Sequence, residues 1–166
     1  MPVIVAAVGV GGWFLYDRYG LRAESRAEIT EACQGLVDPA AVMGFGSRRV
    51  DAAPAGDAVC VLRHAVMFEG QEEMREFVSL TVVAAKDAGP GGSRFEYGDR
   101  GVTAIAKCAD PAASAGVTSL RVTAATEGDG GGRGEPGFLS GLAREAALRA
   151  AAKAGCGTTL PAAPKY

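Results

Sequence analysis

The chain has 166 residues, of which 48% are hydrophobic and 22% are charged, and its formal net charge at pH 7 is -2. This balance excludes a strongly basic surface, so we expect no nucleic-acid partner and no polybasic patch for acidic lipids. Aromatic residues make up only 7%, which predicts a core of valine, leucine and alanine. Such a core gains less free energy per buried side chain, so covalent bridges become useful.

Residues 1–20, MPVIVAAVGVGGWFLYDRYG, predict an N-terminal membrane anchor. The run is uncharged up to Asp17, and at about 1.5 Å of rise per residue it spans roughly 24 Å, somewhat less than the roughly 30 Å hydrocarbon core of a bilayer. Trp13, Tyr16 and Tyr19 gather at its C-terminal end, where aromatic side chains mark a membrane interface. The alternatives are a cleavable signal peptide and a buried core element.

The flanks of this run favour the anchor. A cleavable signal normally has a basic region before the apolar run and a small-x-small site after it, and the sequence shows neither. Its glycines would weaken a soluble helix or strand more than a membrane helix. We therefore expect an uncleaved anchor whose preceding basic residues are missing from this start. The arginines after the run would by themselves favour a cytoplasmic domain; they are Arg18, Arg22 and Arg26.

The cysteines favour the opposite orientation. They are even in number and widely spaced, without a C-x-x-C pair or a neighbouring histidine that would indicate zinc; they are Cys33, Cys60, Cys108 and Cys156. Behind a membrane segment this pattern predicts two structural disulfides in an oxidising compartment, with buried free thiols and metal binding as alternatives. We give the cysteines more weight than the arginines and expect an extracytoplasmic domain.

Two helices are predicted after the anchor. Ser25 and Glu28 have the spacing of a capping box, which predicts a helix start at Ser25. A buried stripe with i, i+3, i+4, i+7 spacing should then place Cys33 toward the core; its members are Ile29, Ala32, Cys33 and Leu36. Asp38-Pro39 predicts the start of a short second helix over Ala40–Met43.

Alternation of apolar and polar residues predicts four strands after these helices. They lie at 57–68, 76–85, 101–108 and 117–126. The first two should be joined as a hairpin through Glu69–Arg75, and the turns rich in glycine and proline are typical of an antiparallel meander. A further edge strand is weakly indicated near Val50.

The last part of the chain predicts one more helix, over Phe138–Lys153, with Gly155 as a plausible stop. The glycine-rich stretch 127–137 before it indicates a flexible loop. The order of elements predicts the α+β class, with an antiparallel four- or five-stranded sheet and the N-terminal and C-terminal helices packed on one face. We expect this domain to occupy residues 24–157, followed by a proline-bearing tail over 158–166.

Four cysteines allow three disulfide connectivities. We predict Cys33 with Cys60 and Cys108 with Cys156, because consecutive elements are usually neighbours in space. Each of these bridges would tie a terminal helix to the sheet.

No catalytic or metal-binding signature is readable in the sequence. His64 is the only histidine, and Cys60 on the same strand would lie roughly 13 Å from it, beyond hydrogen-bond reach. The glycine-rich stretch lacks the ending of a P-loop, and the acidic hairpin tip lacks the pattern of a calcium loop. The tip glutamates are Glu69, Glu72, Glu73 and Glu76. We therefore expect no enzyme activity, no cofactor and no metal, with a hydrolytic enzyme as a remote alternative.

Three cysteine-bearing segments follow one another along the chain. They are Cys33-Gln34-Gly35-Leu36-Val37-Asp38-Pro39, Ala58-Val59-Cys60-Val61-Leu62, and Gly155-Cys156-Gly157 before Leu160-Pro161. Their order resembles that in uncharacterised actinobacterial cell-envelope proteins, which are often lipoproteins or single-pass anchored proteins. The resemblance covers most of Arg22–Pro164 and implies a secreted α+β domain. The chain departs from the lipoprotein members in lacking their lipid-attachment cysteine.

These features together predict a single-pass, membrane-anchored extracytoplasmic domain of the bacterial cell envelope with a binding or interaction role. The expected partners are the membrane, through residues 1–20, and an envelope protein, a glycan or a small apolar ligand. The alternative is an extracellular sensor or accessory module of an envelope signalling system. A concave apolar pocket would favour a small ligand, and a flat, patch-rich sheet face would favour a protein.

Overall fold

The structure is a computed structural model that describes residues 21–43, 49–86, 90–127 and 136–163. The predicted anchor, with Trp13, Tyr16 and Tyr19, lies outside these residues, as does most of the glycine-rich stretch. No helix in the described ranges is long and apolar enough to cross a membrane.

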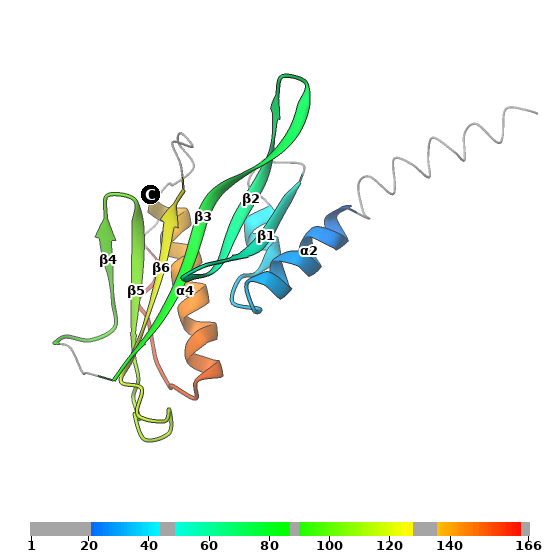
Figure 1. The fold of residues 1–166 in the computed structure, drawn as a ribbon. Coiled ribbons are helices and arrows are strands. Elements are labelled where there is room, and N and C mark those ends of the chain that lie inside the picture. Colours follow the sequence, from blue (N-terminus) through cyan, green and yellow to red (C-terminus); the bar gives the residue numbers. More distant parts are fainter. Residues whose placement is uncertain (1–20, 44–48, 87–89, 128–135, 164–166) are drawn as a thin grey trace, which may run out of the picture.

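A six-stranded antiparallel sheet lies at the centre of the fold (Figure 1). Its strands are β1 (Val50–Ala55), β2 (Ala58–Phe68), β3 (Gln71–Ala85), β4 (Arg94–Gly98), β5 (Gly101–Lys107) and β6 (Ser119–Thr126). In space they follow the order β1-β2-β3-β6-β5-β4. Two three-stranded meanders therefore meet where β3 pairs with β6, from Val78 opposite Thr126 to Ala85 opposite Ser119.

The α+β class and the antiparallel sheet are confirmed, whereas the predicted four or five strands and the single meander are wrong. The missed strand is β4, which has only five residues and lies at a sheet edge. Charged residues protect edge strands from pairing with other chains, so Arg94 and Glu96 hide the apolar alternation of β4. The opposite edge strand, β1, contains Pro54, which is tolerated only where one side of the strand is unpaired.

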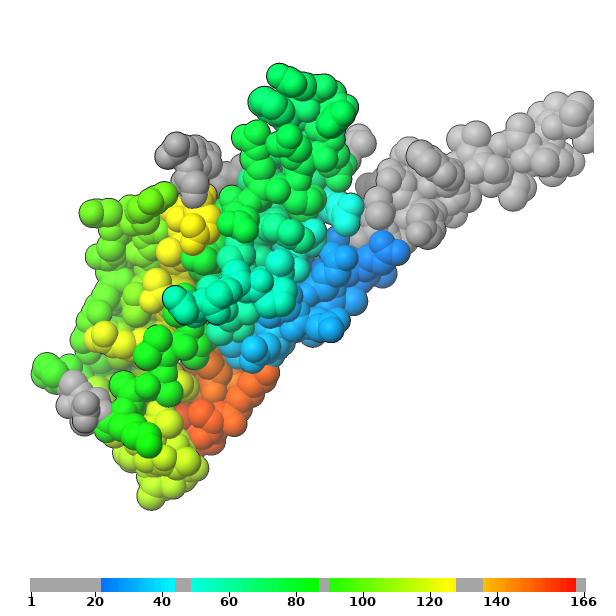
Figure 2. Space-filling view, viewed as in Figure 1, coloured from blue at the N-terminus to red at the C-terminus, as the bar shows by residue number. Residues whose placement is uncertain are grey.

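The hairpin between β2 and β3 is longer than the sequence predicts. Residues Gln71–Arg75, expected in a connection, belong to β3, and Phe68 pairs directly with Gln71. The turn consists of Glu69 and Gly70, whose φ angles are 49° and 82°, as in a type I′ turn. β1 reaches only as far as His64 on β2, and β3 begins to pair with β6 only at Val78, so residues 65–75 form a two-stranded arm that projects beyond the sheet (Figures 1 and 2). We call this segment the hairpin arm.

Helix α2 (Leu21–Ala32) begins four residues before the predicted capping box, so that prediction is wrong. Ser25 lies inside the helix and is buried, in line with Ile29 and Cys33 at four-residue intervals. Ser25 is therefore a small residue on the core-facing stripe and not an N-cap. The predicted start of the next helix is confirmed, because the Ala40 backbone N–H donates to the Asp38 carboxylate at 2.8 Å at the beginning of α3 (Pro39–Met43).

Helix α4 (Pro136–Lys153) packs against β5 and β6 with a surface of small residues. Its buried residues are Leu139, Ser140, Leu142, Ala143, Ala146, Ala147, Ala150 and Ala151. The strands beneath also present buried alanines, at Ala104, Ala106 and Ala124. Alanine on both surfaces lets the helix approach the sheet closely, which is how a core poor in aromatic residues is filled. Leu160, in the predicted tail, is also buried against this core.

Helices α2 and α4 end in the same kind of turn. After α2, the Gln34 N–H donates to the Glu31 carbonyl at 3.0 Å and the Gly35 N–H to the Thr30 carbonyl at 2.7 Å. After α4, the Gly155 N–H donates to the Ala152 carbonyl at 3.2 Å and the Cys156 N–H to the Ala151 carbonyl at 2.8 Å. These are Schellman motifs, and they confirm Gly155 as the stop of α4.

Both predicted disulfides are present and buried. Cys33, directly after α2, is bonded to Cys60 in β2 with a Cα–Cα distance of 5.0 Å. Cys156, directly after Gly155, is bonded to Cys108 at the end of β5 with a Cα–Cα distance of 4.8 Å. Each Schellman turn thus presents a cysteine to the sheet, and each terminal helix is joined covalently to a strand.

The first prediction concerns these two bridges. They close loops of 27 and 48 residues, and in the chain-entropy model each bridge destabilises the unfolded chain by roughly 3.5 to 4 kcal/mol. Thermal unfolding of Cys33→Ser/Cys60→Ser and of Cys108→Ser/Cys156→Ser should each show a melting temperature lower by about 10 °C or more. Reduction of the unmodified chain should do the same, and hydrogen exchange should show the helices opening before the strands. Unchanged melting after confirmed reduction would contradict a stabilising role.

The second prediction concerns Glu69 in the arm turn. A non-glycine residue at positive φ is strained, and asparagine tolerates this conformation better than glutamate. Glu69→Asn should therefore stabilise the domain by about 0.5 to 1 kcal/mol. The matched control is Glu72→Asn, which removes the same charge from a strand position of the arm. An equal rise in melting temperature for both variants would attribute the gain to charge instead of the turn.

Candidate functional site

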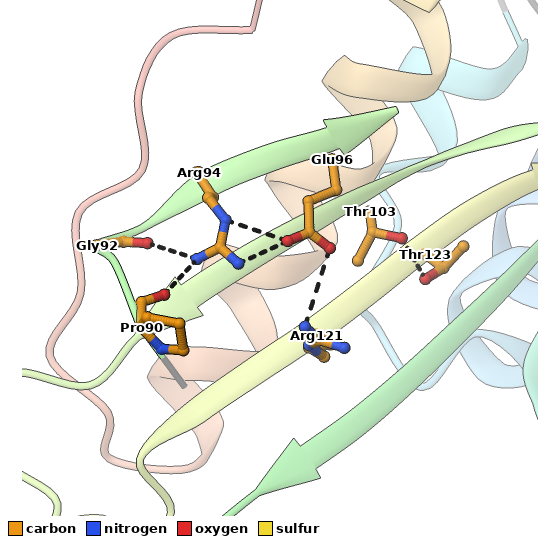
Figure 3. A network of polar contacts seen from close by, with 7 residues as sticks. All are labelled: Pro90, Gly92, Arg94, Glu96, Thr103, Arg121 and Thr123. Atoms are coloured by element: carbon orange, nitrogen blue, oxygen red, sulfur yellow. Dashed lines mark hydrogen bonds and ion pairs between the residues drawn. The ribbon is translucent and has the colours of Figure 1, made fainter. Parts of the chain in front are cut away.

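The helices leave one face of the sheet uncovered, and we call it the open face (Figure 2). Two rows of side chains cross it from β3 to β4. The first contains Thr81, Thr123, Thr103 and Glu96, which lie directly opposite one another on neighbouring strands. The second contains Val83, Arg121, Ile105 and Arg94 in the same strand order. Figure 3 shows Glu96, Thr103 and Thr123 of the first row and Arg94 and Arg121 of the second on the side of the sheet away from the helices.

Arg94 is fully engaged in structural contacts. Its Nε and Nη2 atoms donate to Glu96 Oε1 at 3.1 and 2.6 Å, and its Nη1 donates to the carbonyls of Pro90 and Gly92 at 3.2 and 3.3 Å. The guanidinium therefore ties the turn before β4 to the strand itself (Figure 3). Such a forked set of bonds fixes both partners in orientation.

Glu96 links this arrangement to a second arginine. Its other oxygen, Oε2, lies 3.9 Å from Nη2 of Arg121, at the limit of an ion pair. This is the only hydrogen bond or ion pair of the Arg121 side chain within the described residues, and that side chain is 51% exposed. Arg121 is therefore held in place by Glu96 but keeps most of its donors available.

Ile105 lies between the two arginines, since it pairs with Arg94 on one side and with Arg121 on the other. Although it belongs to the open face, it is only 2% exposed. Long arginine stems shield apolar surface while their charged ends stay in water.

In the first row, the hydroxyls of Thr103 and Thr123 lie 2.8 Å apart and are hydrogen-bonded to each other.

A shallow depression of about 280 Å³ lies over this part of the face. It is lined by Val83, Ala85, Pro90, Arg94, Ile105, Lys107, Ser119 and Arg121. Three of these residues are basic and most of the others are apolar. Such a lining can hold an anionic group beside an apolar one.

A different ion pair lies at the other end of the open face, on β1 and β2. Asp51 is buried and accepts from Arg63 Nε at 2.8 Å and from its Nη2 at 3.1 Å. The hydrogen bonds that Arg63 donates to Asp51 raise the pKa of Arg63, so the guanidinium stays charged. Arg63 and Asp51 thus bond each other at two points, whereas Arg121 has a single, distant ion pair.

Two other depressions are less suited to a defined ligand. One, of about 440 Å³, lies between α2 and β1 and carries Glu28 and Glu31 beside Ala52 and Val59. The other, of about 380 Å³, follows the last turn of α4 around Cys156. Neither is the concave apolar pocket between sheet and helix that would favour a small apolar ligand.

The residues singled out from the sequence do not assemble into a reactive centre. The half-buried His64 ring lies 5.1 Å from the ring of Phe77, and Cys60 is disulfide-bonded. Among the glutamates of the hairpin arm, Glu73 pairs with Arg75 at 3.4 Å. No group of three or more potential metal ligands is found in the described part of the chain.

The sequence does not predict the second row, which contains Arg94 and Arg121, because it does not predict β4. The available signal was Arg94-Phe95-Glu96, in which two charges alternate with a ring between glycine-bearing turns. Arg121, in contrast, is 25 positions away from Glu96 along the chain, and only the strand register brings the two together.

Comparisons with protein family models, curated proteins and solved structures found no significant match to this chain. Function is therefore inferred from the disulfides and from the geometry of the open face.

Proposed function

We propose that the chain is a binding domain of the bacterial cell envelope, located on the extracytoplasmic side and held at the membrane by residues 1–20. The observation that carries this proposal is the pair of buried disulfides, Cys33–Cys60 and Cys108–Cys156. Disulfides form and persist in oxidising compartments and are rare in the cytosol. The apolar run with its aromatic end supports tethering.

A binding role is supported by the two-sided character of the sheet. One face is covered by helices, while the open face presents side chains at positions fixed by strand register. Arg94 and Glu96 hold each other and orient Arg121 toward solvent. A charged group supported in this way on a rigid sheet is suited to recognising a partner.

A second candidate function, an accessory module that docks another envelope protein, is favoured by the hairpin arm. Met67 is 71% exposed and Phe68 is 48% exposed, and both lie next to the turn at the end of the arm. As consecutive strand residues they point to opposite faces of the arm, so both faces near its tip carry a large exposed apolar side chain, and exposed apolar surface of this kind marks interaction sites. Here Phe68 also lies under the Arg75 guanidinium, 5.2 Å from the ring centroid.

The third prediction tests the compartment. The full chain, produced in a bacterial host, should fractionate with membranes, and its four cysteines should resist alkylation in intact cells until a reductant is added. The control is a variant without residues 1–20, which should stay in the cytoplasm with alkylatable thiols. Four free thiols in the full chain, or a full chain that is soluble with an intact N-terminus, would overturn the proposal.

The fourth prediction tests the hairpin arm. A photo-crosslinking residue in place of Met67, in the full chain in its native membrane, should give one discrete protein adduct. The same residue in place of Ala152, which is exposed on α4, should give none. Equal labelling from both positions, or none from Met67, would remove the docking candidate and leave the disulfide-based proposal unchanged.

A further inference from the structure

Three features make the depression on the open face more than a gap between side chains. It contains an arginine whose side chain is held by one distant ion pair, a hydroxyl that makes no hydrogen bond within the described residues, and an apolar floor. The arginine and the hydroxyl lie two residues apart on one strand, and strand register places the apolar floor from two further strands beside them. They are Arg121 of β6, Ser119 at the start of β6, and Ile105 of β5 with Val83 of β3.

Among Arg94, Glu96 and Arg121, one positive charge is in excess. Glu96 is paired closely with Arg94, at 2.6 Å, and only distantly with Arg121, at 3.9 Å. Arg94 is also bound to two backbone carbonyls, so its geometry is fixed whether or not a ligand is present. The pair Arg94–Glu96 is thus neutral overall, and Arg121 is the group that can bind an anion.

Ser119 adds a hydrogen-bonding group to the depression beside Arg121. This residue is only 5% exposed and lines the depression. Within the described residues its hydroxyl makes no hydrogen bond, although its neighbour Thr118 donates to the Ala85 carbonyl at 3.0 Å. The Ser119 oxygen is not among the buried polar atoms without a partner, so this hydroxyl is open to the depression and can donate to a ligand atom there.

The floor of the depression is apolar, so the part of a ligand that does not contact Arg121 should be apolar too. Val83 is 52% exposed and lines the depression together with Ala85, Pro90 and Ile105. A volume of about 280 Å³ is at the lower end of small-molecule sites. It suits a short chain or a single ring better than a polymer segment.

We infer that the depression binds a small carboxylate with a short apolar chain, with the carboxylate on Arg121 and Ser119 and the chain over Val83 and Ala85. The inference rests on the proposed function, because it names the ligand class taken by the open face. Arginine presents a planar fork that matches a carboxylate with two parallel hydrogen bonds. A phosphate monoester carries about -1.5 to -2 charge at pH 7, which the nearby Glu96 carboxylate would repel.

The fifth prediction tests this inference by NMR on the full chain in a non-ionic detergent. Butyrate is the probe, and 1-butanol, acetate and butyl phosphate are its matched comparisons. Butyrate should shift the amide signals of Ser119, Arg121 and Ile105 with saturation in the millimolar range. Acetate, 1-butanol and butyl phosphate should each bind at least about threefold more weakly. Acetate lacks the apolar chain, 1-butanol lacks the negative charge, and butyl phosphate has a phosphate in place of the carboxylate.

Variants separate binding from folding. Arg121→Gln should lose butyrate affinity about tenfold or more, and Ser119→Ala about threefold, while the remaining amide spectrum keeps its folded dispersion. Arg75→Gln, which removes an arginine from the hairpin arm, should leave butyrate binding unchanged. Absence of saturable shifts, equal binding by Arg121→Gln, or tighter binding of butyl phosphate would each overturn the carboxylate assignment. None of those outcomes alters the compartment result, so failure here is distinguishable from failure of the proposed function.

Discussion

The covalent bond between the last turn of each terminal helix and the sheet is the constraint on which the rest of the fold depends. A Schellman turn has a fixed shape, because two backbone hydrogen bonds close it. Cys33 and Cys156 occupy positions within or directly beside these turns, so each helix meets its strand partner at one defined point. Helix α4 then lies on alanines, whose small side chains offer few interlocking contacts to fix its position. The disulfides therefore fix the helices on the sheet, a role that interlocking large side chains have in other cores.

A second link joins the two helices where these turns meet. Arg149 Nη1 donates to the Gly35 carbonyl at 3.2 Å, and Lys153 Nζ donates to the Gln34 carbonyl. The last carbonyls of a helix carry partial negative charge, so cations from α4 complement the end of α2. The two halves of the sheet, each with its own helix and disulfide, are therefore held together on the covered face as well as through the β3–β6 pairing.

The sequence predicted features that depend on local spacing or on chain order. The Asp38-Pro39 helix start and the stop at Gly155 rest on local chemistry, and the disulfide pairs follow from consecutive elements being neighbours. The errors have physical causes too. Ser25 imitates an N-cap because serine is also small enough for a buried helix stripe, and β4 is hidden by its edge charges. The approach of Arg121 to Glu96 needs the register of β4, β5 and β6, which no local pattern contains.

The Cys33–Cys60 bridge also determines how the domain bears mechanical load. A pull on the N-terminal end of α2 passes through Cys33 into β2, an interior strand paired on both sides with β1 and β3. The segment between the two cysteines, which includes α3 and β1, lies outside this load path. It cannot lengthen under tension, and cutting a single peptide bond within it would leave α2 covalently attached. A domain pulled from its N-terminal side would therefore resist extension through a bond that is independent of its hydrophobic core.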